Sequence, residues 1–238
     1  MGAEQPLREP LAGPNPLIVA VDTSDLERAE RLAADLEGIV AFVKIGLELF
    51  TATGPSAVQR LRPHARVFLD LKLHDIPTTV ARAARNAALL DVDLMTVHAL
   101  GGMEMVRAAV DGAAEGAASI GIEPPAVVGV TVLSSLAGEG LASPASLAFE
   151  AVSAGARGVV VSGSDVREVR EALGAGPFLV VPGIRPSGVF SNDHVRVLTP
   201  GEALEQGADY VVVGRPVSDA SDPAAAARAI LREAGVPT

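Results

Sequence analysis

Short apolar runs alternate with longer amphipathic segments along most of this chain, and this alternation restricts the folds that it can adopt. The apolar runs are near-continuous in valine, isoleucine and leucine and lack a two-residue polar–apolar period. Such runs are typical of parallel strands that are buried on both faces of a sheet. The expected strands are residues 17–21, 42–45, 67–71, 94–98, 126–132, 158–161, 178–181 and 210–213.

The amphipathic segments between these strands predict helices. Ser24 is the expected N-cap of the first helix, which would extend to about residue 37 with Glu27 at the capping-box position. Further helical residues are expected up to about 61, and at 77–90, 103–118, 144–154, 165–173 and 223–233. Strands that alternate with helices in this way favour an α/β fold, a single (β/α)8 TIM barrel, over the alternative of an open doubly wound sheet.

The length of the chain suits one such barrel. It has 238 residues, and a (β/α)8 domain typically needs about 250. We therefore expect residues 17–238 to form the barrel domain. Residues 1–16 contain several prolines among mixed charges, and we expect them to be a mobile N-terminal tail.

The overall composition argues against several classes of protein. A formal net charge of −10 disfavours nucleic acid and anionic membranes as partners. No apolar run approaches the roughly 18 residues that a membrane-spanning helix needs. The chain has no cysteine, which removes disulfides, thiolate metal sites and cysteine nucleophiles and fits a cytoplasmic protein.

Polar residues gather where the expected strands end. They are Asp22, Lys44, Asp70 with Lys72, His98, Thr131, residues 182–185, and Gly214 with Arg215. In a barrel the C-terminal ends of all the strands converge on one mouth, where the active site lies. An open sheet would spread the same residues across its width. The pattern therefore favours a barrel with its active site at the C-terminal strand ends.

The densest charged group is the run Asp70-x-Lys72-x-x-Asp75, with Lys44 one strand earlier. On a strand, Asp70 and Lys72 share a face, and Asp75 lies in the following turn. A surface salt-bridge cluster is the alternative, but three charges at a strand end are costly in an apolar protein unless they are paired or functional. The two carboxylates should keep both lysines protonated. A protonated lysine suits proton donation and not Schiff-base chemistry.

A resident metal ion is not expected. The carboxylates at the predicted mouth offer oxygen ligands to magnesium, but Lys44 and Lys72 occupy the same space and compete with a cation. No pair of histidines has the spacing of a metal site. We expect His64 and His74 at the surface, and His98 as a packed or supporting group.

The connections after the seventh and eighth strands predict a phosphate site. Gly183 and Arg185 follow the seventh strand, and Gly214 and Arg215 follow the eighth. Barrels commonly bind phosphate at these two loops. Glycine lets backbone N–H groups approach the oxygens, and arginine supplies a bidentate clamp. The alternative is that the two glycines only turn the chain.

Several segments together resemble one known family. The run VFLDLKLHDIPTTV, residues 67–80, resembles the signature of the orotidine 5′-phosphate decarboxylase family. The segments IVAVD, FVKIG, TVHALGG, TVLSS, VPGIRP and VVVGRPV follow the order and spacing of that family over nearly the whole chain from residue 17. The resemblance implies a barrel that converts orotidine 5′-phosphate to uridine 5′-phosphate in de novo pyrimidine biosynthesis, without a cofactor.

The resemblance also implies roles for the charged residues. Asp70 would face the carboxylate of the substrate, and Lys72 would protonate C6 of the pyrimidine as carbon dioxide leaves. Lys44 would hydrogen-bond Asp70 and the ribose, and Asp22 would bind ribose hydroxyls. Arg215 would belong to the phosphate site.

Further residues are assigned by the same resemblance. Asp75 and Thr79 would reach into the site of a neighbouring subunit, which implies a homodimer with shared active sites. Thr131 and Ser134 lie where the family contacts the pyrimidine. His194 stands where the family usually has a glutamine that contacts phosphate and base, so the role of this position is open.

Two other functions are compatible with parts of the pattern. The related hexulose-phosphate synthases share the Asp-x-Lys-x-x-Asp run, but they are metal-dependent aldolases and typically carry glutamate in place of Lys44. A non-catalytic phosphate-binding barrel would be expected to have lost Lys72. A decarboxylation assay with and without a chelator separates all three.

Overall fold

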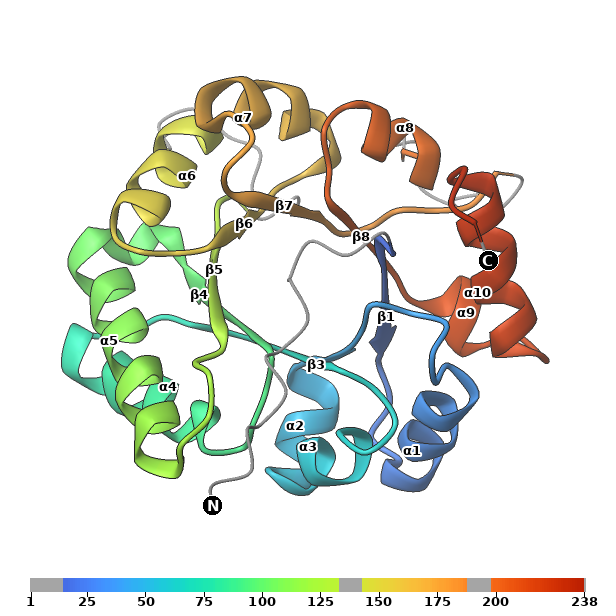
Figure 1. Ribbon diagram of the computed structural model, residues 1–238, viewed down its shortest axis with the longest axis horizontal. Coiled ribbons are helices and arrows are strands. Elements are labelled where there is room, and N and C mark those ends of the chain that lie inside the picture. Colours follow the sequence, from blue (N-terminus) through green and yellow to red (C-terminus); the bar gives the residue numbers. More distant parts are fainter. Residues whose placement is uncertain (1–14, 133–142, 188–197, 238) are drawn as a thin grey trace, which may run out of the picture.

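The computed structural model describes residues 15–132, 143–187 and 198–237. Within these ranges eight strands form a closed barrel in chain order, and β1 pairs in parallel with both β2 and β8 (Figure 1). The strands are β1 Leu17–Val21, β2 Phe42–Ile45, β3 Val67–Leu73, β4 Leu94–His98, β5 Ala126–Val130, β6 Gly158–Val160, β7 Phe178–Val181 and β8 Tyr210–Val213. The predicted barrel is confirmed, and the closure of the sheet excludes the open alternative.

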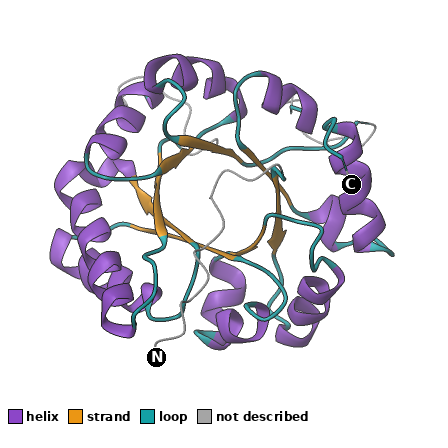
Figure 2. Cartoon of the chain, in the orientation of Figure 1, coloured by secondary structure: helices purple, strands orange, loops and turns teal. Residues whose placement is uncertain are grey.

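Helices surround the strands on the outside of the barrel (Figure 2). They are α1 Leu26–Asp35, α2 Leu47–Thr53, α3 Ser56–Leu61, α4 Pro77–Ala88, α5 Gly102–Ile120, α6 Pro144–Ser153, α7 Val166–Leu173, α8 Pro200–Glu205, α9 Arg215–Ser218 and α10 Pro223–Glu233. None of the helices in the described ranges is both long and apolar enough to cross a membrane.

The helices differ from the sequence-based expectation at the start of α1 and in the presence of α8 and of the short α9. The N-cap of α1 is Asp25 and not Ser24, because Asp25 Oδ1 accepts hydrogen bonds from the backbone N–H groups two and three residues ahead, at 2.9 and 3.1 Å. A carboxylate in this position also interacts favourably with the positive end of the helix dipole. Helix α8 was not expected, although Thr199 and Glu202 form a capping box at its start, which is a signal that the sequence carries.

Apolar side chains fill the interior of the barrel. These inward-facing residues are Ile18, Ala20, Phe42, Phe68, Leu94, Ala126, Val128, Phe178, Val180, Tyr210 and Val212. The Tyr210 ring makes edge-on contacts with Phe42 and Phe178 at centroid distances of 5.5 and 5.8 Å, a favourable geometry for aromatic pairs. A larger apolar layer lies between the strands and the helices. The barrel is therefore a packed core, and a site can form only beyond this plug.

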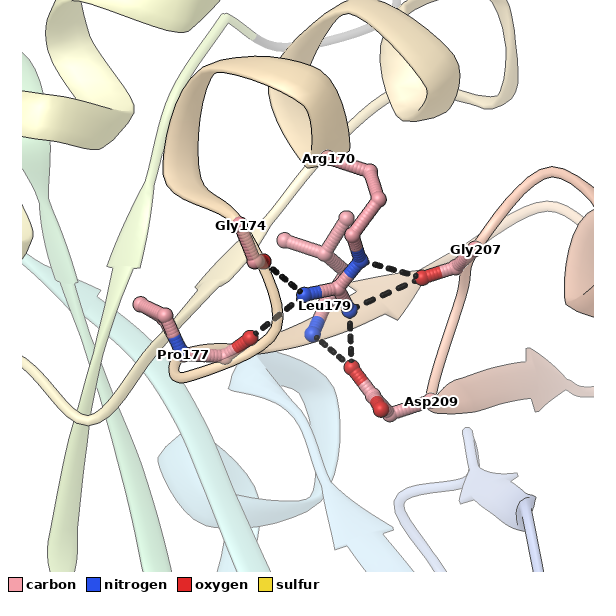
Figure 3. A network of polar contacts seen from close by, with 6 residues as sticks. All are labelled: Arg170, Gly174, Pro177, Leu179, Gly207 and Asp209. Carbon is pink, nitrogen blue, oxygen red and sulfur yellow. Dashed lines mark hydrogen bonds and ion pairs between the residues drawn. The ribbon is translucent and has the colours of Figure 1, made fainter.

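A half-buried arginine, Arg170, connects α7 to the beginnings of β7 and β8 (Figure 3). The Arg170 guanidinium donates to the carbonyl oxygens of Gly174, Pro177 and Gly207 at 2.7–3.0 Å and pairs with Asp209. The Asp209 carboxylate also accepts the N–H of Leu179 in β7, at 2.7 Å. These contacts lie at the N-terminal face of the barrel. In (β/α)8 barrels the residues of this face contribute to stability, whereas the catalytic residues lie at the opposite face.

Candidate active site

The inward-facing positions of β1 to β4 change from apolar to polar towards the C-terminal ends of the strands. Each of the following residues lies two positions after an apolar member of the barrel interior: Asp22, Lys44, Asp70 and Thr96. Because side chains two apart on a strand point to the same face, these four lie above the apolar plug. The alternation of the strands thus builds a polar mouth on an apolar floor.

Asp70 is the centre of the charged group. The Lys72 ammonium lies 2.7 Å from Asp70 Oδ2, and the Lys44 ammonium lies 3.4 Å from the same oxygen. The Lys44 ammonium is also 3.7 Å from Asp22 Oδ1. Ion pairs thus link Lys44, Asp70 and Lys72, which are the first three members of an expected chain Lys44–Asp70–Lys72–Asp75. The side chains of Lys44 and Asp70 are largely buried, whereas Asp22 is exposed.

Asp70 stays ionised in spite of its burial. Desolvation raises the pKa of its carboxyl, but the positive charges of Lys44 and Lys72 and the hydrogen bonds from Lys72 and Thr96 outweigh it. The pKa of Asp70 therefore lies below its ordinary value. A carboxylate held between two ammonium groups keeps its negative charge at neutral pH.

The backbone at Lys72 is irregular. Its φ is +51°, a left-handed value that L-residues with long side chains rarely adopt. The pairing of β3 with β4 shifts register between Leu69 and Leu73, as expected at a β-bulge. Lys72 and Asp70 were expected to share a face because of regular strand alternation, and this reason is wrong. The two side chains contact each other all the same. Backbone strain of this kind is typical of functional sites.

Thr96 was not among the predicted site residues. It lies in β4 and is 1% exposed. Its hydroxyl donates to Asp70 Oδ1 at 2.9 Å and accepts the N–H of Lys72 at 2.8 Å. The sequence did contain a signal, because a hydroxyl at the inward-facing position two residues before His98 interrupts an apolar strand.

His98 and His74 pack against each other beside this group. Their ring centroids are 5.3 Å apart, and His98 Nδ1 is buried without a hydrogen-bond partner in the described structure. Burial lowers the pKa of His98, and the nearby charges of His74 and Lys72 lower it further, against an opposing effect of Asp70. His98 is therefore a packed group, as expected, and His74 is exposed but contacts it.

In the described ranges, no hydrogen bond or ion pair joins the side chain of Asp75 or Thr79 to Lys44, Asp70 or Lys72. Asp75 and Thr79 are both exposed, and Asp75 Oδ1 accepts the N–H of Ile76 at 2.6 Å. Within the described ranges, no ion pair joins Asp75 to Lys72. The fourth member of the expected Lys–Asp–Lys–Asp chain is thus not assembled within one subunit.

The predicted phosphate loops lie at the ends of β7 and β8. Gly183 has a φ of +75°, which favours glycine. A Cβ at Gly214 would lie 3.7 Å from Asp22 Oδ2, so the end of β8 adjoins the ribose-binding candidate on β1. Arg215 is exposed at the start of α9, and Arg185 is half-buried after β7.

The remaining predicted residues are only partly described. Thr131 is fully buried, and its hydroxyl donates to the carbonyl oxygen of Val160 at 3.0 Å. Ser134 and His194 lie outside the described residues. Their assignment to the pyrimidine and the phosphate stays a prediction.

Comparison with known proteins gives one family model and several relatives that carry the same name. The family model "Orotidine 5'-phosphate decarboxylase / HUMPS family" matches residues 15–230. Orotidine 5′-phosphate decarboxylase of Anaeromyxobacter sp. (strain K) is 51% identical over 225 residues, which is 90% of this chain and 96% of that protein. The enzyme of that name from Moorella thermoacetica is 45% identical over 229 residues, 91% of each chain.

A solved structure agrees with these relatives. The crystal structure of orotidine 5′-phosphate decarboxylase from Lactobacillus acidophilus superposes with a TM-score of 0.80 and 37% identity, covering 92% of this chain and 99% of that one. The match therefore extends over nearly the whole of both chains, in sequence and in fold. This chain belongs to the orotidine 5′-phosphate decarboxylase family.

Proposed function

We propose that this protein converts orotidine 5′-phosphate to uridine 5′-phosphate and carbon dioxide, a step of pyrimidine biosynthesis. The observation that carries the proposal is the pair formed by the Lys72 ammonium and the buried Asp70 carboxylate at 2.7 Å, with the Lys44 ammonium at 3.4 Å from the same oxygen. The names of the relatives support the same reaction. The proposal includes a cytoplasmic location, as expected of a biosynthetic enzyme.

The reaction breaks the bond between C6 of the pyrimidine and its carboxylate carbon. Carbon dioxide leaves, the electron pair stays on C6, and the Lys72 ammonium gives its proton to that carbon. Solvent then reprotonates Lys72. A preorganised cation stabilises the charge that develops at C6 more than it stabilises the ground state, and this difference is what accelerates the reaction.

Asp70 adds a smaller contribution by repelling the substrate carboxylate. Two unit charges about 4 Å apart at an effective dielectric of about 20 interact by about 4 kcal/mol, which corresponds to roughly three decades of rate. Enzymes reach far larger accelerations. We therefore assign the larger share to transition-state stabilisation by Lys72.

The remaining contacts hold the nucleotide. Asp22, beside Lys44 on the same side of the mouth, is placed to bind ribose hydroxyls. Gly214 adjoins Asp22, and Arg215 next to it supplies a cation for the phosphate. Arg185 adds a second arginine from the loop after β7. A dianionic phosphate favours such a glycine–arginine cradle.

A homodimer with shared active sites is part of the proposal. Asp75 and Thr79 are exposed, and in the described ranges no ion pair joins Asp75 to Lys72, where an aspartate would complete the charge alternation. Ile76 follows Asp75 and is 64% exposed. Leu100 and Met103, which are 37% and 41% exposed, flank Gly101, where an added Cβ would lie 3.3 Å from the His74 ring. Large apolar side chains exposed together mark interaction surfaces. A second subunit seated there would cover them and bring in its own Asp75.

Neither alternative function is favoured. A metal-dependent aldolase needs its carboxylates free for a divalent cation, whereas Asp70 is engaged by Lys44 and Lys72. A non-catalytic barrel has no need of a strained lysine at +51°.

The test is a decarboxylation assay that follows the loss of orotidine 5′-phosphate, with and without a chelator. We expect turnover that the chelator does not change. Turnover only in the presence of a divalent metal would contradict the cofactor-free reaction and indicate a metal-dependent enzyme. Binding of uridine 5′-phosphate without any turnover would support the non-catalytic barrel.

A further inference from the structure

The Thr96 hydroxyl joins the two residues at the centre of the proposed chemistry. It donates to Asp70 Oδ1 at 2.9 Å and accepts the Lys72 N–H at 2.8 Å. A threonine hydroxyl has one proton to donate, and here that proton is given to Asp70. Thr96 is 1% exposed, so water does not readily replace either bond.

The hydrogen bond from the Thr96 hydroxyl to Asp70 Oδ1 sets the orientation of the Asp70 carboxylate. Asp70 Oδ2 contacts the ammonium groups of Lys72 and Lys44, at 2.7 and 3.4 Å respectively. Asp70 Oδ1 accepts the hydrogen bond from Thr96. The terminal torsion of an aspartate has broad minima, so a donor on one oxygen decides where the other oxygen points. With Thr96 in place, Oδ2 faces Lys72 and Lys44 from one fixed direction.

The hydrogen bond from the Lys72 N–H to the Thr96 hydroxyl stabilises the strained backbone at Lys72. Regular pairing of β3 with β4 is interrupted between Leu69 and Leu73, and Lys72 lies in that interval with a φ of +51°. Its N–H is satisfied by the hydroxyl from β4 instead of a carbonyl of the sheet. A left-handed lysine persists only where its surroundings determine it, and Thr96 supplies one of the bonds that do so.

We propose that Thr96 is a positioning residue, whose single hydroxyl fixes the Asp70 carboxylate and the left-handed Lys72 backbone relative to each other. This inference rests on the proposed decarboxylase function. It assigns Thr96 no contact with the substrate. Its effect is on how well Lys72 and Asp70 are placed when carbon dioxide leaves, and not on how tightly the nucleotide is held.

The test compares Thr96→Val with Thr96→Ser. Valine keeps the shape and removes the hydroxyl, and serine keeps the hydroxyl. Because a misplacement of about 1 Å can cost about a hundredfold in rate, we expect Thr96→Val to lose about ten- to a hundredfold in kcat. Its dissociation constant for uridine 5′-phosphate should stay within about threefold of wild type, since binding and catalysis are separable. Thr96→Ser should restore most of kcat.

The pH profile separates positioning from a loss of folded enzyme. Loss of the Thr96 bond removes one of the effects that lower the pKa of Asp70, so the acid limb of kcat for Thr96→Val should move to higher pH. Thr53→Val is the matched control, because it removes a hydroxyl that bonds only within α2, to Leu49 O at 2.7 Å. Thr53→Val should change neither kcat nor the acid limb of the pH profile of kcat.

Specific outcomes would overturn the inference. Thr96→Val with a kcat within about twofold of wild type would do so, as would a loss in kcat that follows only the fraction of folded protein. Should the valine variant not fold, Thr96→Ala is subject to the same criteria. Failure of the wild-type chain to turn over orotidine 5′-phosphate would instead refute the proposed function, so the two failures are distinguishable.

Discussion

Lys72 combines an unusual backbone with a short contact to a buried carboxylate. Its side chain reaches Asp70 at 2.7 Å from a left-handed conformation. A backbone conformation that costs free energy is retained where it serves function. The position of the amine thus depends on the local bulge as much as on the identity of the residue.

Removal of that amine should affect chemistry far more than binding. General acid catalysis contributes about 10²–10⁴-fold, and Lys72 also stabilises the developing charge, so Lys72→Ala should lower kcat by at least that factor. Uridine 5′-phosphate should still bind, because its phosphate is held at the ends of β7 and β8. Steady-state kinetics and a binding titration measure the two effects. If Lys72→Ala kept a tenth of wild-type kcat, Lys72 would not be the proton donor of the reaction.

His98 makes the stability of the fold depend on pH. Its pKa is lowered in the folded state by burial and by the charges of His74 and Lys72, whereas in the unfolded chain it is about 6.5. Below about pH 6.5 the unfolded state therefore binds a proton that the folded state does not, and stability falls as the pH drops towards the folded-state pKa.

This argument predicts that His98→Gln flattens the pH dependence. Urea unfolding of wild type should give a free energy of unfolding that decreases as the pH falls below about 6.5, and the decrease should be smaller in the variant. His64→Gln is the control, because His64 is a partly exposed residue on the outside of the barrel. Parallel curves for wild type and His98→Gln would show that His98 titrates normally.

At the scale of elements, two glycines let α4 and α5 pack closely. A Cβ at Gly112 would lie 2.2 Å from Ala81 O, and one at Gly116 would lie 2.4 Å from Arg85 O. Both oxygens belong to the backbone of α4 and have little room to move. These helices lie side by side in Figure 1, and α4 begins directly after the loop that carries Asp75.

Gly112→Ala should therefore destabilise the protein. Alanine gains about 1 kcal/mol of helix propensity over glycine, but overpacking against a backbone costs typically about 1–3 kcal/mol and is severe at 2.2 Å. Chemical denaturation should show a net loss. In the control Gly201→Ala the new Cβ has an ordinary contact of 3.6 Å with Glu233 O, so stability should be unchanged or higher. Equal stability of Gly112→Ala and wild type would refute the close packing.

At the scale of the whole molecule, the proposed dimer would bring Asp75 of one subunit to Lys72 of the other. A shared site can be tested by mixing Lys72→Ala subunits with Asp75→Asn subunits, each inactive alone. In a heterodimer one site carries both lesions and the other carries none. Random mixing makes half of the dimers mixed, so about a quarter of wild-type activity should return.

The control for mixing is demonstrated subunit exchange. Two Lys72→Ala preparations, mixed in the same way, should recover nothing, because every site then lacks its amine. Exchange without recovery in the mixed pair would place Asp75 in the site of its own chain. A protein that sediments as a monomer under assay conditions would refute the proposed dimer itself.

The sequence alone determined the order of the elements and the position of the charged residues. Buried strands appear as local apolar runs, and a polar residue at the end of such a run is visible without a structure. β1, β2, β4, β7 and β8 begin and end at the expected residues. The family resemblance rests on local motifs for the same reason. The assignment of residues 1–16 as a tail rests on the sequence alone and stays a prediction. The same holds for the assignment of His194 to the phosphate.

Only the tertiary structure decided how these residues meet. The bulge at Lys72, the hydrogen bonds of Thr96 and the local hydrogen bond of Asp75 depend on the register between β3 and β4 and on the direction of the following loop. Both are set by packing between segments far apart in the chain, which no local pattern encodes. A hydroxyl in a buried strand was visible in the sequence, but its two partners became known only when the neighbouring strand was placed beside it.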